Sequence, residues 1–225
     1  MDMAKRMAKE GMGEGTVIIA GEQTAGRGRL GRKWLSPPGG SLSLSIILRP
    51  TLPQLPQLNM AACLATVQSI EKVSGLKPTI KWPNDVLLNG KKVSGILMEN
   101  IFDGGELKAT ILGIGINAKF DALAFTEISA IATSLSTESG REISPEEILP
   151  SLLEEFEQIY QELQGGRKIY ERWLARVETL GKLVRVKSGD TIEEGYAESI
   201  NPNGSLILRR LDGSLITMVT GESQG

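Results

Sequence analysis

The central part of the chain alternates hydrophobic and polar residues with a period of two, and tight turns interrupt the alternation. Residues 41–46 alternate serine with leucine or isoleucine, which predicts a half-buried strand. Asn89-Gly90 is the strongest two-residue hairpin signal and would join strands at 85–88 and 91–102. Further strands are expected at 16–20, 79–82 and 107–116. Consecutive strands on tight turns pair antiparallel, so we expect a mixed, largely antiparallel sheet.

Hydrophobic residues at helical spacing predict helices before, between and after these strands. The clearest start is Ser144-Pro145-Glu146-Glu147, where a serine cap, a proline at the first position and a glutamate at the third form a capping box. The acidic residues on the opposite face of this helix are expected to be solvated rather than to bind a metal. The helices are expected at 2–10, 53–73, 126–140, 145–164 and 169–174. We expect them on one side of the sheet, which gives an α+β fold.

The residue pattern of the sequence changes after Gly181. Turns rich in glycine, asparagine and aspartate separate short segments with strand-like composition. The expected strands are 183–186, 191–199, 205–211 and 214–219. This spacing predicts a small β module, either a five-stranded or an SH3-like barrel. We therefore divide the chain into a large domain at 1–179 and an SH3-like β domain at 180–225.

The 225 residues include no histidine and one cysteine. Without histidine, the chain can build neither a Ser-His-Asp nor a Cys-His pair, and no HExxH zinc site. Chemistry must then depend on carboxylates, lysines, arginines, backbone amides or a metal held by oxygen. Cys63 lies in an apolar helical run, so we interpret it as a core residue rather than a reactive thiol.

The charges are nearly balanced, with 25 Lys and Arg against 27 Asp and Glu and a formal net charge of -2. This balance argues against general nucleic-acid binding. The longest apolar runs are too short to cross a bilayer, and no signal peptide opens the sequence. A reducing cytoplasm is the expected location, with no membrane partner.

A basic, glycine-rich loop follows the first predicted strand. Four of the seven residues from Arg27 to Lys33 are cationic, and Gly26, Gly28 and Gly31 match G-x-G-x-x-G. That pattern binds dinucleotides only where a helix opens at the third glycine, and the Pro- and Gly-rich residues 34–40 exclude one here. The loop instead suits a nucleoside triphosphate, a carboxylate or both. A solvated basic loop is the plainer alternative, and an RNA contact is only weakly supported because the loop has one aromatic residue and no repetition.

A second segment whose side chains could bind or react with a ligand surrounds the predicted hairpin. If Asn89-Gly90 is a two-residue turn, Leu87 pairs with Lys92 and Asp85 pairs with Ser94. Asp85 and Lys92 then lie diagonally on one face, close enough to interact or to grip one ligand. A structural salt bridge is the simpler interpretation of the pair taken alone.

Several motifs follow one another in a specific order. They are residues 22–32 (EQTAGRGRLGR), Trp34, Ser36-Pro37, residues 81–85 (KWPND), Lys92, residues 95–97 (GIL) and residues 113–117 (GIGIN). Their order and spacing resemble those of biotin protein ligases over nearly the whole chain. The resemblance implies the class II aminoacyl-tRNA synthetase-like fold of these ligases. It also implies their reaction as biotin–[acetyl-CoA-carboxylase] ligases: biotin and ATP give biotinyl-5'-AMP, and biotin then passes to one lysine of a biotin carboxyl carrier protein.

The resemblance also assigns roles to individual residues, with biotin, ATP and Mg²⁺ as the small-molecule partners. The implied catalytic residues are Lys92, Arg27, Asp85 and Lys81. The implied biotin-binding residues are Gln23, Arg27, Gly28, Arg29, Lys92, Gly95 and Gly115. The implied nucleotide-binding residues are Arg29, Arg32, Trp34, Lys81, Lys92 and Asn117. Asp85 would orient or deprotonate the incoming amine or help to hold Mg²⁺, and Trp34 would be either a hydrophobic lid or an adenine stack.

The sequence departs from the family pattern at its beginning. A Ser-Thr element that normally precedes the first helix and binds the biotin ring is not seen, so we expect either a start codon placed too far downstream or weak biotin binding. A winged-helix domain is not seen either, so the resemblance implies a monofunctional ligase that does not bind DNA. The family often pairs sheets side by side, which makes a homodimer an expectation.

Two alternative functions remain open from sequence. The first is a lipoate or octanoate ligase or transferase of the same fold, although the contiguous string from Gly26 to Arg32 favours biotin. The second is a catalytically weakened protein that senses biotin or a nucleotide. The retained Lys81, Asp85 and Lys92 speak against that interpretation.

Overall fold

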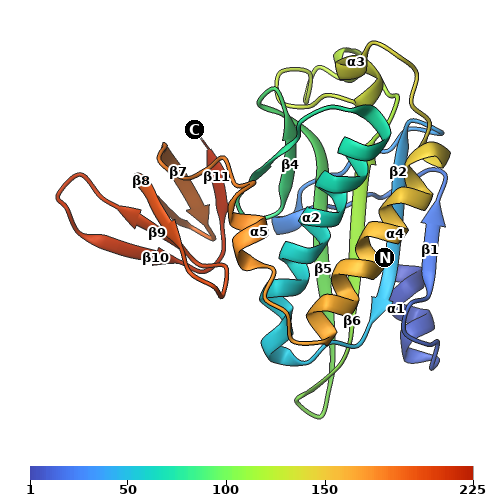
Figure 1. The fold of residues 1–225 in the computed structure, drawn as a ribbon, viewed down its shortest axis with the longest axis horizontal. Coiled ribbons are helices and arrows are strands. Elements are labelled where there is room, and N and C mark those ends of the chain that lie inside the picture. Colours follow the sequence, from blue (N-terminus) through green and yellow to red (C-terminus); the bar gives the residue numbers. More distant parts are fainter. Residues whose placement is uncertain (225) are drawn as a thin grey trace.

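Two antiparallel sheets organise the chain in the computed structural model, which describes residues 1–224 (Figure 1). The large sheet has six strands in the order β1-β2-β6-β5-β4-β3, and every neighbouring pair is antiparallel. The strands are β1 (Val17–Ala20), β2 (Ser41–Leu48), β3 (Thr79–Lys81), β4 (Asp85–Leu88), β5 (Lys91–Asp103) and β6 (Glu106–Asn117). The predicted antiparallel sheet and the Asn89-Gly90 hairpin are confirmed.

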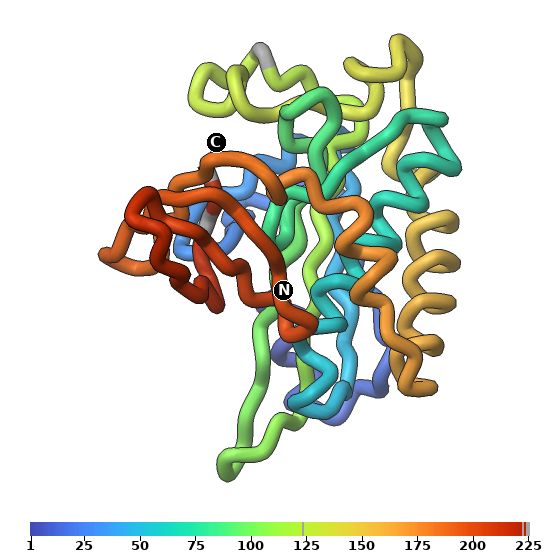
Figure 2. Tube along the Cα trace, turned by 60° about the vertical axis from the view of Figure 1, so that its left-hand side comes forward, coloured from blue at the N-terminus to red at the C-terminus, as the bar shows by residue number. Residues whose placement is uncertain are grey.

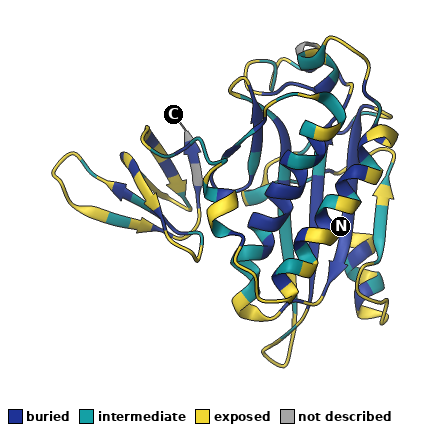
Figure 3. Cartoon of the chain, viewed as in Figure 1, coloured by how far each residue is buried: buried dark blue, intermediate teal, exposed yellow. Residues whose placement is uncertain are grey.

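The longer helices cover one face of this sheet, as predicted. They are α2 (Leu55–Ser74) and α4 (Pro145–Gln164), and the short helix α5 (Tyr170–Leu174) lies on the same face. Figure 3 shows α2 mostly buried between the sheet and its neighbours. The capping box at Ser144 is present at the start of α4. Helix α1 (Asp2–Lys9) instead packs on the opposite face, because Ala4 and Ala8 contact a separate cluster around Ile47 and Ile111. Each of the helices described is too short or too polar to cross a membrane.

Burial corrects the interpretation of β2 as half-buried. All eight of its residues are buried. Leu42, Leu44 and Ile46 enter the core beneath the helices, whereas the serines between them face the other side. The long loop after β1 covers that side, and Ser36 of the loop lies within hydrogen-bonding distance of Ser43, at 3.1 Å between the two Oγ atoms. The alternation was recognised correctly, but both faces are covered.

The predicted helix at 126–140 is wrong over most of its length. Only α3 (Leu135–Ser139) is helical, and the residues before it form turns. The backbone of this stretch pairs with β5 instead: Lys92 N donates to Ile131 O at 2.8 Å, and Thr133 N donates to Lys92 O at 2.9 Å. Ile131, one of the apolar residues that suggested a helix, is 60% exposed. Strand pairing therefore satisfies backbone groups that a helix would have used.

The C-terminal sheet has five strands, one more than the four that were located in the sequence. They are β7 (Leu183–Ser188), β8 (Thr191–Ile200), β9 (Leu206–Arg209), β10 (Leu215–Met218) and β11 (Glu222–Gln224), in the order β10-β9-β8-β7-β11. No pairing joins β10 to β11 within residues 1–224, so the sheet is open where a barrel was expected. Figure 2 shows the C-terminal sheet beside the large sheet. A single cluster of buried side chains, which includes Val184, Leu206 and Trp173, extends through both sheets.

Cys63 lies in the middle of α2 and is fully buried, which confirms its interpretation as a core residue. Burial raises the pKa of its thiol to about 12. The reactive thiolate is therefore strongly disfavoured in the folded chain.

Candidate active site

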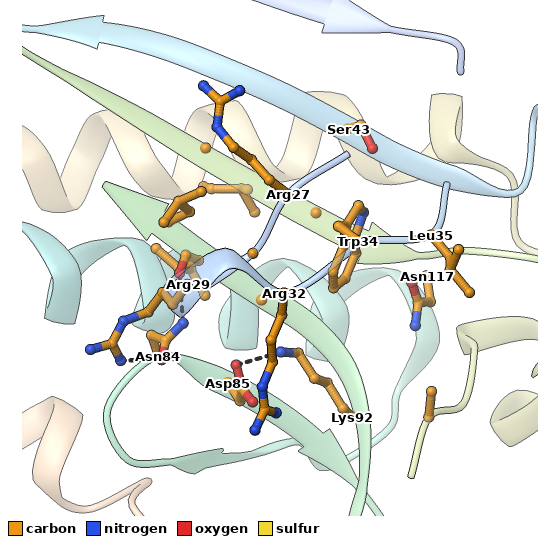
Figure 4. Close-up of a pocket in the computed structure, with 18 of the residues that line it drawn as sticks. Arg27, Arg29, Arg32, Trp34, Leu35, Ser43, Asn84, Asp85, Lys92 and Asn117 are labelled. Atoms are coloured by element: carbon orange, nitrogen blue, oxygen red, sulfur yellow. Dashed lines mark hydrogen bonds and ion pairs between the residues drawn. The ribbon is translucent and has the colours of Figure 1, made fainter. Parts of the chain in front are cut away.

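A cavity of about 620 Å³ lies between the large sheet and the loop that follows β1 (Figure 4). Its walls contain every one of the twelve residues singled out from sequence. They are Gln23, Arg27, Gly28, Arg29, Arg32, Trp34, Lys81, Asp85, Lys92, Gly95, Gly115 and Asn117. The structure brings these residues together around one cavity, and the roles assigned to them stay predictions.

The floor of the cavity is a single row of cross-strand partners. Ser43 of β2 lies opposite Gly115 of β6, Gly115 opposite Gly95 of β5, Gly95 opposite Asp85 of β4, and Asp85 opposite Lys81 of β3. Apolar residues one step along the strands point to the other face and belong to the core, among them Leu44, Ile114, Ile96, Val86 and Ile80. The strand alternation that fills the core thus places a line of small and charged residues on the cavity side.

The two glycines of the row allow an aromatic ring to lie against the backbone. A Cβ on Gly115 would be 2.5 Å from Cζ2 of Trp34, and one on Gly95 would be 3.3 Å from Cζ3. The indole ring therefore occupies the space above both glycines. Its Nε1 is buried without a hydrogen-bond partner among the described residues, so this donor is unsatisfied in the structure.

Lys92 and Asp85 form an ion pair beside this ring. The distance from Lys92 Nζ to Asp85 Oδ1 is 2.7 Å, and Nζ lies 5.7 Å from the centroid of the Trp34 ring. The predicted contact between the two side chains is confirmed, but the predicted pairing of Asp85 with Ser94 is wrong. A bulge leaves Val93 as an extra residue on β5, so Val86 pairs with Ser94 and Asp85 with Gly95.

The basic loop folds back on itself as a small hairpin. Trp34 N donates to Gly26 O at 2.9 Å, and Gly28 N donates to Arg32 O at 2.7 Å. Gly26 is required here because a Cβ would be 2.4 Å from the carbonyl oxygen of Trp34. After Gly31 the backbone becomes extended at Arg32, so no helix opens there and the rejection of a dinucleotide fingerprint is confirmed.

Arg27 is held by two carboxylates that sequence reasoning missed. Its guanidinium donates to both oxygens of Asp2 in α1 and to both oxygens of Glu99 in β5. Figure 4 shows the side chain directed away from Lys92 and Asp85. The hydrogen bonds to Asp2 and Glu99 raise the pKa of Arg27 above its ordinary value. Arg27 therefore lines the cavity with its stem while its charge is engaged at the rim.

Arg29 and Arg32 take different directions from the same loop. Arg29 Nη1 donates to Asn84 Oδ1 at 2.8 Å, while Figure 4 shows Arg32 beside the Lys92–Asp85 pair. Asn84 is fixed in turn because its Nδ2 donates to Ile96 O at 2.6 Å. Asn84 was quoted in the KWPND motif without a role of its own, and the structure buries it beside the basic loop.

Asn117 ends β6 at the far side of the cavity. Its Nδ2 donates to Thr133 O at 2.9 Å, and its Oδ1 is buried without a hydrogen-bond partner among the described residues. Its Oδ1 is therefore an unsatisfied acceptor at this end of the cavity. Ser43, Ser45 and Ser223 also line the cavity and were missed. The serine alternation of β2 could have indicated the first two.

The chain is similar to known proteins along most of its length. The model of the biotin/lipoate A/B protein ligase family matches residues 2–117. The bifunctional ligase/repressor BirA of Bacillus spizizenii is 38% identical over 215 residues, which cover 93% of this chain and 66% of that protein. The biotin–[acetyl-CoA-carboxylase] ligase of Paracoccus denitrificans is 38% identical over 200 residues, which cover 85% and 83% of the two chains. This chain thus spans just under two thirds of the Bacillus relative.

Solved structures extend the similarity to the whole fold. The biotin protein ligase of Aquifex aeolicus, solved in complex with biotin and ATP, superposes with a TM-score of 0.83 at 28% identity and covers 98% of this chain and 93% of its own. The similarity includes the C-terminal sheet, which lies outside the residues that the family model matches. Since that model covers just over half of the sequence and the Paracoccus relative aligns along most of both chains, this chain belongs to the biotin/lipoate A/B protein ligase family.

Proposed function

We propose that this protein is an ATP-dependent biotin protein ligase. It would join the carboxylate of biotin to the α-phosphate of ATP and then transfer biotin from biotinyl-5'-AMP to a lysine of a biotin carboxyl carrier protein. The observation that carries the proposal is the cavity in which Lys92, Arg29 and Arg32 surround a floor of Gly95 and Gly115. Similarity to biotin–[acetyl-CoA-carboxylase] ligases at up to 38% identity supports it.

The first step brings negative charges together. A carboxylate oxygen of biotin attacks the α-phosphorus, the bond between that phosphorus and its bridging oxygen to the β-phosphate breaks, and pyrophosphate leaves. Repulsion between the carboxylate and the triphosphate makes this barrier largely electrostatic. Lys92 would stabilise charge at the α-phosphate, and Lys81, Arg29 and Arg32 would bind phosphate oxygens. No step needs histidine, in agreement with its absence from the sequence.

Asp85 would act in the second step. The amine of the acceptor lysine attacks the carbonyl carbon of the adenylate, AMP leaves, and the amine loses a proton that a nearby carboxylate can accept. Asp85 lies 2.7 Å from Lys92, which places this carboxylate beside the proposed reacting centre. The pairing would also hold the Lys92 side chain in place until the anionic substrates arrive.

Mg²⁺ fits the site only as an ion carried by the nucleotide. Within residues 1–224, no three acidic or cysteine side chains gather as a metal site. Mg²⁺ commonly keeps several waters and binds through one or two carboxylates plus substrate phosphates. Asp85 is the carboxylate that would complete such a shell, and the ion would neutralise triphosphate charge.

The two ends of the adenylate would occupy different parts of the cavity. Biotin would lie against the backbone of Gly95 and Gly115 in the space that the Trp34 ring occupies in this structure, so the ring would move aside and then shield biotin from above. Gln23, Gly28 and the stem of Arg27 lie in the covering loop. Asn117 keeps an unpaired acceptor at Oδ1, while one N–H of its amide group donates to Thr133 O. Oδ1 would accept a hydrogen bond from the exocyclic amine of adenine.

The remaining assignments follow from this function. Residues 1–179 would form the catalytic domain, and residues 180–225 an accessory β domain. The acceptor would be the carrier domain of acetyl-CoA carboxylase or a related enzyme, and the expected location is the cytoplasm. We also propose a homodimer that pairs large sheets side by side.

The decisive experiment compares biotin with lipoate as the substrate of the protein. Biotin and lipoate, each radiolabelled, are incubated with ATP, Mg²⁺ and an apo-carrier domain. Incorporation of biotin alone supports the proposal, whereas labelling by lipoate alone would assign the protein to the other branch of its family. Pyrophosphate release in the absence of carrier separates a ligase from a protein that only binds biotin or nucleotide.

A further inference from the structure

The C-terminal sheet reaches the cavity through the turn that precedes β11. Arg29 Nη2 donates to Thr220 Oγ1 at 2.9 Å, and Nη1 approaches Gly221 O at 3.4 Å in addition to its hydrogen bond with Asn84. Thr220 lies 191 residues from Arg29 in sequence. One guanidinium therefore joins the basic loop, the KWPND segment and the C-terminal sheet.

The turn that carries Thr220 is itself held in place. Ser223 Oγ donates to Trp82 O at 2.9 Å, and Trp82 Nε1 donates to Gly204 O at 2.8 Å. Gly221 packs so closely against β7 that a Cβ would be 2.6 Å from Cγ1 of Val186. The hydroxyl of Thr220 is thus presented from a fixed backbone, and the segment that fixes it also contains Asn84.

From this geometry we infer that Thr220 is a positioning residue that acts through Arg29. Its hydroxyl restricts the guanidinium to one direction at the mouth of the cavity, so the C-terminal sheet determines where this cation meets the nucleotide. Arginine has several rotatable bonds, and each fixed acceptor removes conformers that would have to be lost on binding. The inference rests on the proposed function for its effect on the adenylate, but the contact itself can be tested without ligand.

The first test measures the retention of biotinyl-AMP. The adenylate is formed with radiolabelled biotin and ATP, and its release is followed after dilution. Thr220→Val keeps the shape of the side chain and removes the acceptor, so we expect release to become roughly fivefold faster. Thr220→Ser keeps the hydroxyl and should restore retention. Thr217→Val, on an exposed position of β10, is the matched control and should behave as the unmodified protein.

A double-mutant cycle shows whether the effect passes through Arg29. Arg29→Ala should accelerate release by itself, and adding Thr220→Val to it should change nothing further. Additive effects of the two substitutions would contradict the inference, as would an unchanged release rate in Thr220→Val.

Hydrogen exchange of the ligand-free protein supplies a readout that does not depend on activity. The amides of residues 26–34 should exchange faster in Thr220→Val than in Thr217→Val, while the amides of α2 keep their protection. Equal exchange in both variants would overturn the inference. If the unmodified protein forms no biotinyl-AMP, the proposed function fails, and the exchange experiment still decides whether Thr220 orders the loop.

Discussion

Lys92 and Asp85 face each other across a bulge in the β4–β5 hairpin, with 2.7 Å between Nζ and Oδ1. Both side chains are partly exposed, at 33% and 26%. Ion pairs with this degree of solvent contact contribute little to stability, about 0–1 kcal/mol. Loss of either partner should therefore be visible in the reaction rather than in the fold, and the two partners should affect different steps.

Lys92→Ala should greatly slow the first step, the formation of biotinyl-5'-AMP. The substitution removes a fixed cation from the position where charge would develop, which typically costs about 10²–10³-fold in rate. The measurement is pyrophosphate release with biotin and ATP, accompanied by thermal unfolding to verify the fold. Lys91→Ala is the control, because Lys91 lies on the same strand but does not line the cavity. Undiminished pyrophosphate release in Lys92→Ala would contradict the role proposed for Lys92.

Asp85→Asn should slow transfer more than adenylate formation. The amide keeps the size of the side chain but cannot accept the proton of the incoming amine, so we expect transfer to fall about 10²-fold or more. Single-turnover transfer from preformed biotinyl-AMP to a carrier domain isolates this step. Asp103→Asn, at the distant tip of the β5–β6 hairpin, serves as the control. An equal loss in both steps would instead favour the proposal that Asp85 helps to hold Mg²⁺.

The same hairpin illustrates what could be predicted from sequence. The Asn89-Gly90 turn and the alternation around it are local signals, and they were sufficient to bring Asp85 and Lys92 together. The bulge at Val93 was not predicted, because it depends on how β5 fits between β4 and β6. The short strand β11 was missed for a similar reason, since three residues carry little local pattern and it forms by pairing with β7.

Partners distant in sequence were the main omission at the site. Arg27 and Arg29 were both identified, but the acceptors that orient them come from Asp2, Glu99 and Thr220. A single sequence contains no local signal for such contacts, because they depend on the packing of whole elements. The error at 126–140 is of the same kind, as apolar spacing suggested a helix where the backbone pairs with Lys92.

Gly115→Ala should weaken biotin binding while the fold persists. A methyl group at this position would be 2.5 Å from the Trp34 ring, so the ring must move and the floor of the cavity rises. Overpacking of this kind costs about 1–3 kcal/mol, which corresponds to roughly 5–150-fold in the dissociation constant. Calorimetric titration with biotin measures the effect. Gly13→Ala is the control, because a Cβ there would meet nothing within 4 Å. Unchanged affinity in Gly115→Ala would show that biotin does not bind against this part of the sheet.

Glu99→Gln should change the dependence of stability on pH. Partial burial raises the pKa of Glu99, but the hydrogen bonds from Arg27 and Lys5 lower it by more. The pKa of Glu99 therefore lies below its ordinary value of 4.5. A carboxyl with a lowered folded-state pKa contributes stability that is present above its unfolded pKa and is lost as the pH falls through the folded pKa. Its contribution is therefore complete at pH 7 and declines below about 4.5.

We expect Glu99→Gln to lower the free energy of unfolding at pH 7 by about 1 kcal/mol, because the ion pairs of Glu99 with Arg27 and Lys5 are about as exposed as the Lys92–Asp85 pair. Below pH 4 the difference from the unmodified protein should shrink, since the glutamate is then protonated as well. Urea unfolding at both pH values measures it, with Glu127→Gln in an exposed turn as the control. A difference that stayed constant between pH 7 and pH 3 would show that Glu99 stabilises the chain by packing rather than by its charge, and Arg27 would then owe its position to Asp2.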